Sequence, residues 1–340
     1  MKFLSRLLGV VLILGMIMVI ASFFMGTNLA EVTGFFNDKE SYSEVMTVDV
    51  TNPIDTLIID VETRHLIFHD SDDDQMHIMY RIHETKDDWM FNDDVAGTFE
   101  IIQQEKQVLW NWFNFSFVDD EYREVHLYIP HDWMITLDAA SSVGSIEMLY
   151  QNLRPFTAIH VSTDTGSIRL KNIEANLLEA DLETGDISLV NVNIQGDIEI
   201  SNSTGDIDLT NVIGQDTNVQ TSTGKISLET FDLSTLDVRV STGRIELSEG
   251  TMNGQCLLRS DTGSITISMV EASGFDVDSS TGDVTMTVAD LALYRFDLET
   301  DTGTIRIDGM SQGNEHQTST GSILTIISVN TGSITIHVQD

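Results

Sequence analysis

The sequence has one cysteine and few basic residues, and each shortage excludes a class of protein. A single cysteine, Cys256, rules out an intrachain disulfide. Only 17 lysines and arginines stand against 54 aspartates and glutamates, which gives a formal net charge of -37. So acidic a chain is unsuited to bind nucleic acid or anionic lipid headgroups, because both carry negative charge. The same charge suits a soluble exterior face, cation binding or a basic partner.

An uncharged apolar run lies near the N-terminus. Residues 7–25 (LLGVVLILGMIMVIASFFM) are enough to span a hydrocarbon core of about 30 Å. Lys2 and Arg6 precede the run and acidic residues follow it, so the positive-inside rule places the N-terminus in the cytoplasm and the rest outside. We therefore expect residues 1–26 to be an uncleaved single-pass anchor in the cell membrane, followed by a linker over 27–44. A cleaved signal peptide, whose apolar core is usually shorter, is the alternative.

A ladder of glycines recurs about every 20 residues through the C-terminal two thirds of the chain. From Gly166 onward each glycine follows a threonine, as in DTGSIRL, STGKISL and DTGTIRI. A fixed period of this size is typical of a solenoid, whose coils pack mainly on their neighbours. We predict an all-β solenoid over 137–340, with coils stacked about 4.8 Å apart. The ladder consists of Gly144, Gly166, Gly185, Gly205, Gly224, Gly243, Gly263, Gly282 and Gly303.

Apolar residues occupy the same places in each unit and alternate with polar ones. Around Gly166 they are Ile159, Val161, Ile168 and Leu170. This alternation predicts two short strands per coil with one face turned inward. Cys256 falls in an inward column, which favours a buried small hydrophobe over a reactive thiol. A third inward corner is indicated seven places after the glycine by Ile173, Val192, Val212, Phe231 and Val270.

The Thr-Gly pair marks a corner between strands. A tight corner often needs positive φ, which glycine adopts without steric cost, and the threonines could form a hydrogen-bonded ladder between coils. Three corners, at Asp164, Asp261 and Asp301, spell the Asp-Thr-Gly triplet of aspartic proteases. That enzyme needs two carboxylates sharing one proton, whereas other coils place serine in this column. We therefore expect the triplet to be structural.

Residues 45–136 lack the ladder but contain strand-like segments, including TLIIDVE, HLIFHD and MHIMYRIHE. We expect this region to start the same β-structure and to cap the first coil, because an open solenoid end exposes unpaired edges. The aspartates from Asp70 to Asp74 resemble a hairpin loop between two of its strands.

Two groups in this region are weak candidates for metal. Asp70, Asp72 and Asp74 offer oxygen ligands for Ca²⁺, but the loop lacks the glycine and glutamate of an EF-hand, so a solvated turn is favoured. His65 and His69 share a strand face, and His77 and His83 lie on the next strand. Paired strands would bring them together, although no cysteine or defined carboxylate set completes a site. We expect no metal and no cofactor.

An aromatic segment near residue 110 is a candidate contact surface. Trp110 and Trp112 share one face of a predicted strand, with phenylalanines close by. Tryptophan is enriched at interaction hot spots and stacks well on sugars and apolar partners. Burial of both rings in the core is the alternative.

The repeats S/D-T-G-D/S/K-I-x-L resemble those of the bacterial putative-adhesin family of β-strand repeat proteins, including the LiaG-type envelope proteins. The upstream segment TLIIDVETRHLIFHDSDDDQMHIMYRI also looks like that family's first hairpins, and LYIP looks like its entry into the coils. The resemblance covers about residues 45–340. It implies an extracytoplasmic, membrane-attached protein without family catalytic residues.

These features favour a structural or interaction protein of the bacterial envelope over an enzyme, because repeat geometry leaves few residues for a catalytic site. The expected partner is an envelope protein or glycan, with the membrane contacted only through the N-terminal helix. A regulatory partner of an envelope-stress signalling system is one alternative. A polysaccharide-active β-helix enzyme is another, and it would need Asp, Arg and Lys clustered on one face in neighbouring coils.

Overall fold

The computed structural model describes residues 41–106 and 120–339, and this part of the chain is all-β, as expected. Its regular structure is strand, apart from short 3₁₀ turns such as Asp120–Tyr122 (η3) and Leu291–Leu293 (η4). Within these two ranges no helix is long and apolar enough to cross a membrane. The predicted anchor over 1–26 lies outside them.

The described part of the chain contains the following strands, in chain order. They are β1 (Met46–Val50), β2 (Thr56–Val61), β3 (His65–Asp70), β4 (Met76–Tyr80), β5 (Asp87–Asn92), β6 (Thr98–Glu105), β7 (Glu124–Ile129), β8 (Thr136–Val143), β9 (Ile146–Pro155), β10 (Ala158–Ala175), β11 (Leu178–Ile194), β12 (Ile198–Thr204), β13 (Ile207–Ile213), β14 (Asp216–Leu233), β15 (Thr235–Met252), β16 (Gln255–Thr262), β17 (Ile265–Ser268), β18 (Gly274–Thr281), β19 (Val284–Val288), β20 (Tyr294–Thr302), β21 (Ile305–Ile307), β22 (Met310–Gly313), β23 (Glu315–Gln317), β24 (Ile323–Thr331) and β25 (Ile334–Val338).

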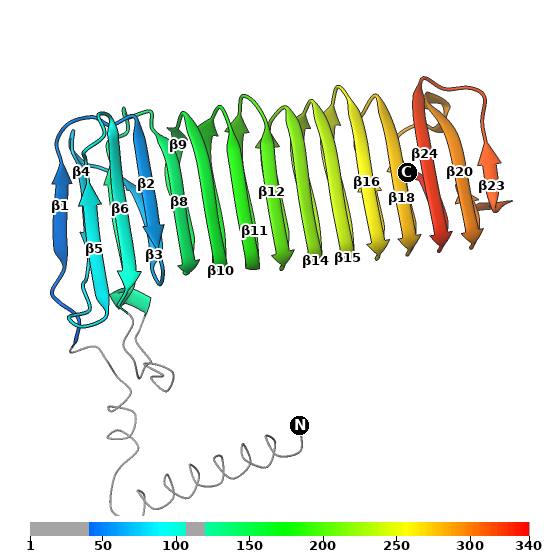
Figure 1. The fold of residues 1–340 in the computed structure, drawn as a ribbon. Coiled ribbons are helices and arrows are strands. Elements are labelled where there is room, and N and C mark those ends of the chain that lie inside the picture. Colours follow the sequence, from blue (N-terminus) through cyan, green and yellow to red (C-terminus); the bar gives the residue numbers. More distant parts are fainter. Residues whose placement is uncertain (1–40, 107–119, 340) are drawn as a thin grey trace, which may run out of the picture.

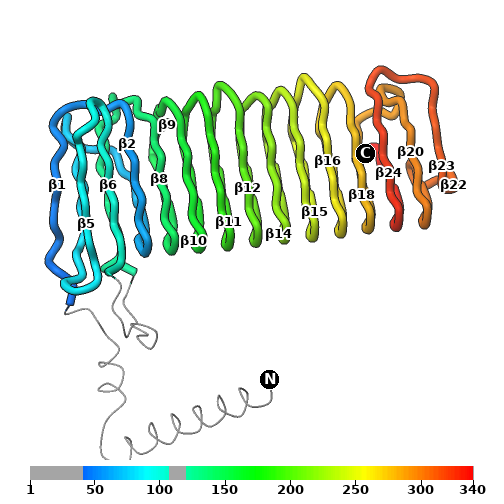
Figure 2. The backbone as a smooth tube through the Cα atoms, viewed as in Figure 1, coloured from blue at the N-terminus to red at the C-terminus, as the bar shows by residue number. Residues whose placement is uncertain are grey.

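From β8 to β19 the chain stacks as successive coils in a single row (Figures 1 and 2). Each coil pairs in parallel with the next in matched register, so that Gly166 lies opposite Gly185 and Gly224 opposite Gly243. The strand before each corner glycine forms a first wall, containing β8, β12, β16 and β18. The strand after it forms a second wall, containing β9, β13, β17 and β19.

The core runs along the whole row between the two walls. The predicted inward columns are buried: Ile159, Val161 and Ile168 are at most 2% exposed, as is Leu170. The third column is buried as well, because each coil bends a second time before Ile173 and its equivalents. Stacking identical columns of aliphatic side chains removes them from water without any helix, and this burial is the main stabilising term.

The corner position requires glycine for two reasons, its backbone conformation and the close approach of the neighbouring coil. Gly224 has φ +149°, and a Cβ there would lie 2.0 Å from the carbonyl oxygen of Gly205 in the preceding coil. No side chain fits at that distance from backbone, so the coils approach this closely only where glycine faces glycine.

Besides backbone hydrogen bonds, side-chain hydrogen bonds cross this corner from the buried residue three places before the glycine. Thr163 Oγ1 donates to the Gly144 carbonyl at 2.9 Å, and Thr300 Oγ1 donates to the Gly332 carbonyl at 2.7 Å. The corner threonines themselves are exposed, for example Thr165. The corner threonines therefore do not form the ladder expected from the sequence, and side-chain hydrogen bonds to corner carbonyls come instead from a buried column in which Leu182 and Val240 also occur.

A second corner holds non-glycine residues in the left-handed region. Asn172, Asn191 and Asn211 have φ of 57°, 57° and 54°, a conformation that asparagine tolerates better than most residues. Their side chains form a ladder in which Asn211 Nδ2 donates to Asn191 Oδ1 at 2.8 Å and Asn191 Nδ2 donates to Asn172 Oδ1. In the next coil the position equivalent to Asn211 is occupied by Thr230, with φ 56°.

The N-terminal end adds strands outside the stack. The first wall continues from β8 through β2 and β6 to antiparallel β5, and the second wall continues from β9 through β3 and β7 to antiparallel β4 and β1. Since β7 lies between β3 and β4, the loop from Asp70 to Asp74 does not close a hairpin, and that prediction was wrong. The antiparallel strands cover the edge of the stack, which an uncapped solenoid would expose.

The C-terminal end departs from chain order. Strand β24 lies between β18 and β20, and β25 lies between β19 and β21, so the final coil is inserted before the coil that precedes it in sequence (Figure 1). The short strands β22 and β23 then pair antiparallel with β21 and β20. They cover the far edge of the row.

Candidate functional site

The candidate site residues predicted from the sequence lie in different surroundings in the structure. Trp110 and Trp112 lie outside the described residues. Asp70 Oδ1 instead accepts a hydrogen bond from the buried Arg154 Nη1 at 3.0 Å and faces His131 Nδ1 at 3.4 Å. Asp72 and Asp74 are exposed on the loop between β3 and β4. Among residues 41–106 and 120–339, no three His, Cys, Asp or Glu side chains are grouped to hold a metal ion.

The histidines on β3 and β4 do not converge, because β7 separates the two strands. His77 Nδ1 faces Asp49 Oδ1 at 2.7 Å, and its Nε2 faces Asp73 Oδ1 at 3.0 Å. The hydrogen bond to Asp49, together with that to Asp73, raises the pKa of His77. The pKa of Asp73 is lowered, first by the backbone amide of Gln75 and then by His77. These contacts fix the loop as a hydrogen-bonded turn.

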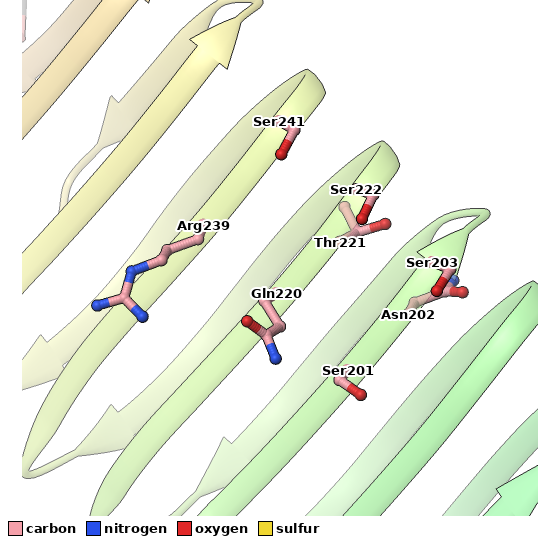
Figure 3. A pocket seen from close by; sticks show the side chains of 8 residues that line it. All are labelled: Ser201, Asn202, Ser203, Gln220, Thr221, Ser222, Arg239 and Ser241. Atoms are coloured by element: carbon pink, nitrogen blue, oxygen red, sulfur yellow. The ribbon is translucent and has the colours of Figure 1, made fainter.

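A groove lined by polar side chains lies on the first wall of the coils. It has a volume of about 330 Å³ and crosses β12, β14 and β15. Figure 3 shows its lining side chains on three adjacent coils, and we call this surface the polar groove: Ser201, Asn202, Ser203, Gln220, Thr221, Ser222, Arg239 and Ser241.

The polar groove lies where three neighbouring coils carry serine in an outward column that holds both acidic and uncharged residues in the other coils. Two places before the corner glycine, Glu183 stands on one side of the groove and Asp261 on the other, whereas the three coils between them carry serine. Four places before the glycine, Gln220 and Arg239 replace the acidic residue found at Asp181. The groove is thus a neutral window in a strongly acidic protein, because Arg239, its one charged lining residue, is paired with Asp237.

The floor of the polar groove is held by the corner hydrogen bonds. Asn202 Nδ2 donates to the Gly185 carbonyl at 2.9 Å, and Thr221 Oγ1 lies 3.5 Å from the Gly205 carbonyl. Outside this floor, the exposed Ser203, Ser222 and Gln220 present hydroxyl and amide groups to solvent. Arg239 donates to Asp237 Oδ2 at 2.6 Å, which holds its guanidinium along the wall. The site offers a rigid, repeating set of donors and acceptors.

A charged cluster lies near the same coils on the second wall. Lys225 Nζ and Arg244 Nη1 lie 2.9 and 3.4 Å from the carboxylate of Glu246. These contacts raise the pKa of Lys225 and lower that of Glu246, whereas burial raises the pKa of Asp208 despite nearby Lys225. Asp206 Oδ1 accepts from the backbone amide of Lys225 at 2.8 Å. Each basic group is engaged with a carboxylate, as expected for a stabilised outer face.

The Asp-Thr-Gly triplets occupy separate coils. Asp261 and Asp301 belong to β16 and β20, with β18 and β24 between them, which places them about 14 Å apart at the usual strand spacing. Two carboxylates at this distance share no proton. Cys256 is fully buried, and burial strongly raises the pKa of its thiol.

Comparison with known proteins identifies a family. A family model described as Toastrack DUF4097 matches residues 54–288. No curated protein matches the chain.

Three crystal structures show a distant likeness. They are a "putative adhesin" from Bacteroides fragilis NCTC 9343 (14% identity, 86% of this chain and 97% of that chain covered, TM-score 0.37), a "putative cell adhesion protein" from Clostridium sporogenes ATCC 15579 (13%, 87% and 99%, TM-score 0.19) and a "putative lipid binding protein" from Parabacteroides distasonis ATCC 8503 (13%, 87% and 97%, TM-score 0.30). Likeness at this level carries no argument about function.

Proposed function

Because the chain belongs to the Toastrack DUF4097 family, we propose that it is a non-catalytic interaction protein of the bacterial envelope, anchored by residues 1–26 and exposed outside the membrane. Its partner is an envelope polysaccharide, which binds along the polar groove of the first wall. The observation that carries the proposal is the neutral window in an acidic wall, built on three adjacent coils.

The chemistry of the polar groove suits a polyhydroxylated polymer. Serine hydroxyls and the Gln220 amide can donate hydrogen bonds to sugar hydroxyls and accept hydrogen bonds from them, and the Arg239 guanidinium can donate. The donors repeat from coil to coil at about 4.8 Å, so a polymer can make many weak contacts in register. Many weak contacts give useful retention without a deep pocket, because each additional contact is effectively intramolecular.

Retention on purified envelope polysaccharide tests the proposal. The full chain in detergent is mixed with polysaccharide stripped of protein and lipid, and the bound fraction is measured for the double variant Ser222→Asp/Ser241→Asp. The column already holds aspartate at Asp261, so the fold tolerates this change. We expect the affinity to fall about tenfold or more, equivalent to about 1.4 kcal/mol, because added carboxylates restore the acidic wall and must be desolvated on binding.

Ser280→Asp is the matched control, since Ser280 is exposed in the same column beyond the polar groove. It should bind as the wild type does. Equal retention of the control and the double variant would refute the groove as the contact surface. Release of new reducing ends from the polysaccharide would support the alternative of a polysaccharide-active enzyme.

The proposed topology rests on the uncharged run of residues 7–25 with Lys2 and Arg6 before it. Protease added to intact spheroplasts should digest residues 45–340 and leave N-terminal peptides in the membrane fraction. Recovery of a mature chain that starts near Glu31 would instead support a cleaved signal peptide.

A further inference from the structure

The final coil of the described chain lies out of sequence order. Its strands β24 and β25 fill a slot between β18 and β19 on one side and β20 and β21 on the other (Figure 1). The chain leaves β19 at Val288, passes this slot through η4, and forms β20 to β23 before it returns to fill the slot. From β8 to β19, in contrast, each coil stacks directly on the coil before it in sequence. The slot therefore accepts strands that arrive from elsewhere in the chain.

The slot matches the final coil along both of its edges. The Gly282 amide donates to the Thr331 carbonyl at 2.9 Å, and the Gly332 amide donates to the Thr302 carbonyl at 3.0 Å. The inward side chains of the coil, such as that of Ile334, are fully buried in the slot. Backbone pairing and aliphatic burial depend only on the sequence of the coil, so the same two strands from a second copy of this chain would fit the slot equally well.

A short and tight connection joins the final coil to the preceding strands. Within the described residues, 318–322 are the only link between β23 and β24. This link passes the start of β20, where the Ser322 amide donates to the Leu293 carbonyl at 2.9 Å. Gly321 has φ +110°, and a Cβ there would lie 2.3 Å from the carbonyl carbon of Tyr294. Short connections under strain favour the exchange of the element that they carry with a second copy.

We propose that two copies of this chain exchange β24 and β25, each pair filling the slot of the other copy, and that the protein is a domain-swapped dimer joined at this end of the two rows. Exchange keeps every contact inside the slot and changes only the path of residues 318–322. It is confined to the final coil, because each coil from β10 to β19 is joined to the chain on both sides and would have to displace two connections. The partner is thus a second copy of this chain, and the inference does not depend on the polysaccharide proposed for the polar groove.

Disulfide trapping between two co-expressed full chains tests the proposal. Thr285 on β19 lies opposite Thr335 on β25, and both side chains are half-buried. One chain carries Thr285→Cys and the other carries Thr335→Cys, each with a different affinity tag. Neighbouring strands bring two such cysteines within disulfide range, so a bond between the two chains forms where β25 of one copy lies beside β19 of the other. We expect this interchain disulfide after purification in detergent and mild oxidation.

Thr266→Cys is the matched control, because Thr266 on β17 lies beside Thr285 on the side away from the slot. Strands β17 and β19 stay in the same copy during exchange. Co-expressed chains carrying Thr266→Cys and Thr285→Cys should therefore give at least about tenfold less interchain disulfide. Equal amounts of interchain disulfide in the test and control pairs would overturn the proposal.

The mass of the protein in detergent, measured by light scattering, is an independent test that needs no cysteine. The wild type should be a dimer. A variant with six Gly and Ser residues inserted between Ser319 and Thr320, both exposed, relieves the tight connection and lets the coil fill the slot of its own chain. Its dimer fraction should fall at least about tenfold. A monomeric wild type, or a dimer that persists unchanged in the lengthened variant, would overturn the proposal.

Discussion

Replacing Gly224 with alanine should disrupt the stack more than any surface substitution. The residue has φ +149°, and holding alanine in such a region costs about 1–3 kcal/mol. The added Cβ would also lie 2.0 Å from the oxygen and 2.6 Å from the carbon of the Gly205 carbonyl. Forcing apart well-packed groups costs about 1–3 kcal/mol more, because neither coil can move without breaking its register with the next. We expect a total loss of about 2–6 kcal/mol in the free energy of unfolding.

Gly309→Ala separates the two contributions. Gly309 has φ +74°, but nothing lies within 4 Å of a Cβ placed there, so only the conformational cost of about 1–2 kcal/mol remains. Urea unfolding followed by circular dichroism gives both values. Hydrogen exchange should also rise in the coils around Gly224 and stay low elsewhere, because coils contact mainly their neighbours. Equal losses of stability in Gly224→Ala and Gly309→Ala would refute the argument that the corner requires glycine because neighbouring coils approach so closely there.

Three further outcomes follow from the geometry. Thr230→Asn should stabilise the protein by about 1 kcal/mol in the same urea assay, because a β-branched residue at φ 56° is strained and asparagine would extend the ladder from Asn211. Cys256 should resist a thiol reagent in the native protein and react in urea, since burial raises the pKa of its thiol. The pKa of His77 is raised in the folded protein, so its protonation stabilises the fold fully below the unfolded pKa of 6.5. This stabilisation is lost as the pH rises through the higher folded pKa. The melting temperature should therefore fall more between pH 6 and 8 in the wild type than in His77→Gln.

The periodic part of the fold could be predicted because each coil repeats the same physical requirement. An inward aliphatic residue such as Ile168 has an equivalent in every coil, and the corner glycine meets the glycine of its neighbour. The pattern therefore determines strand number, direction and register together. The buried hydrogen bonds from Thr163 and its equivalents were missed because that column also holds leucine and valine, at Leu182 and Val240.

The two ends could not be predicted in the same way. The glycine ladder recognised in the sequence ended at Gly303. The structure adds a further coil, which contains Gly332 and lies between the coils of Gly282 and Gly303. Nothing local to β24 specifies that order, because its inward residues fit any place in the row. The contact between His69 and His126 was also missed, since the two residues are 57 positions apart and meet only through the pairing of β3 with β7. The polar groove was missed because it depends on three neighbouring coils that all carry serine in a column where the other coils carry either acidic or uncharged residues.

Photocrosslinking in intact cells tests the central claim most directly. A photoreactive phenylalanine is placed at Gln220, which is exposed in the polar groove, and at Asp278, which is exposed in the same column three coils away. A groove that binds envelope polysaccharide predicts adducts at position 220 that polysaccharide-degrading enzymes remove, with few at position 278. Equal adducts at both positions, or adducts at position 220 that are resistant to those enzymes, would contradict the account.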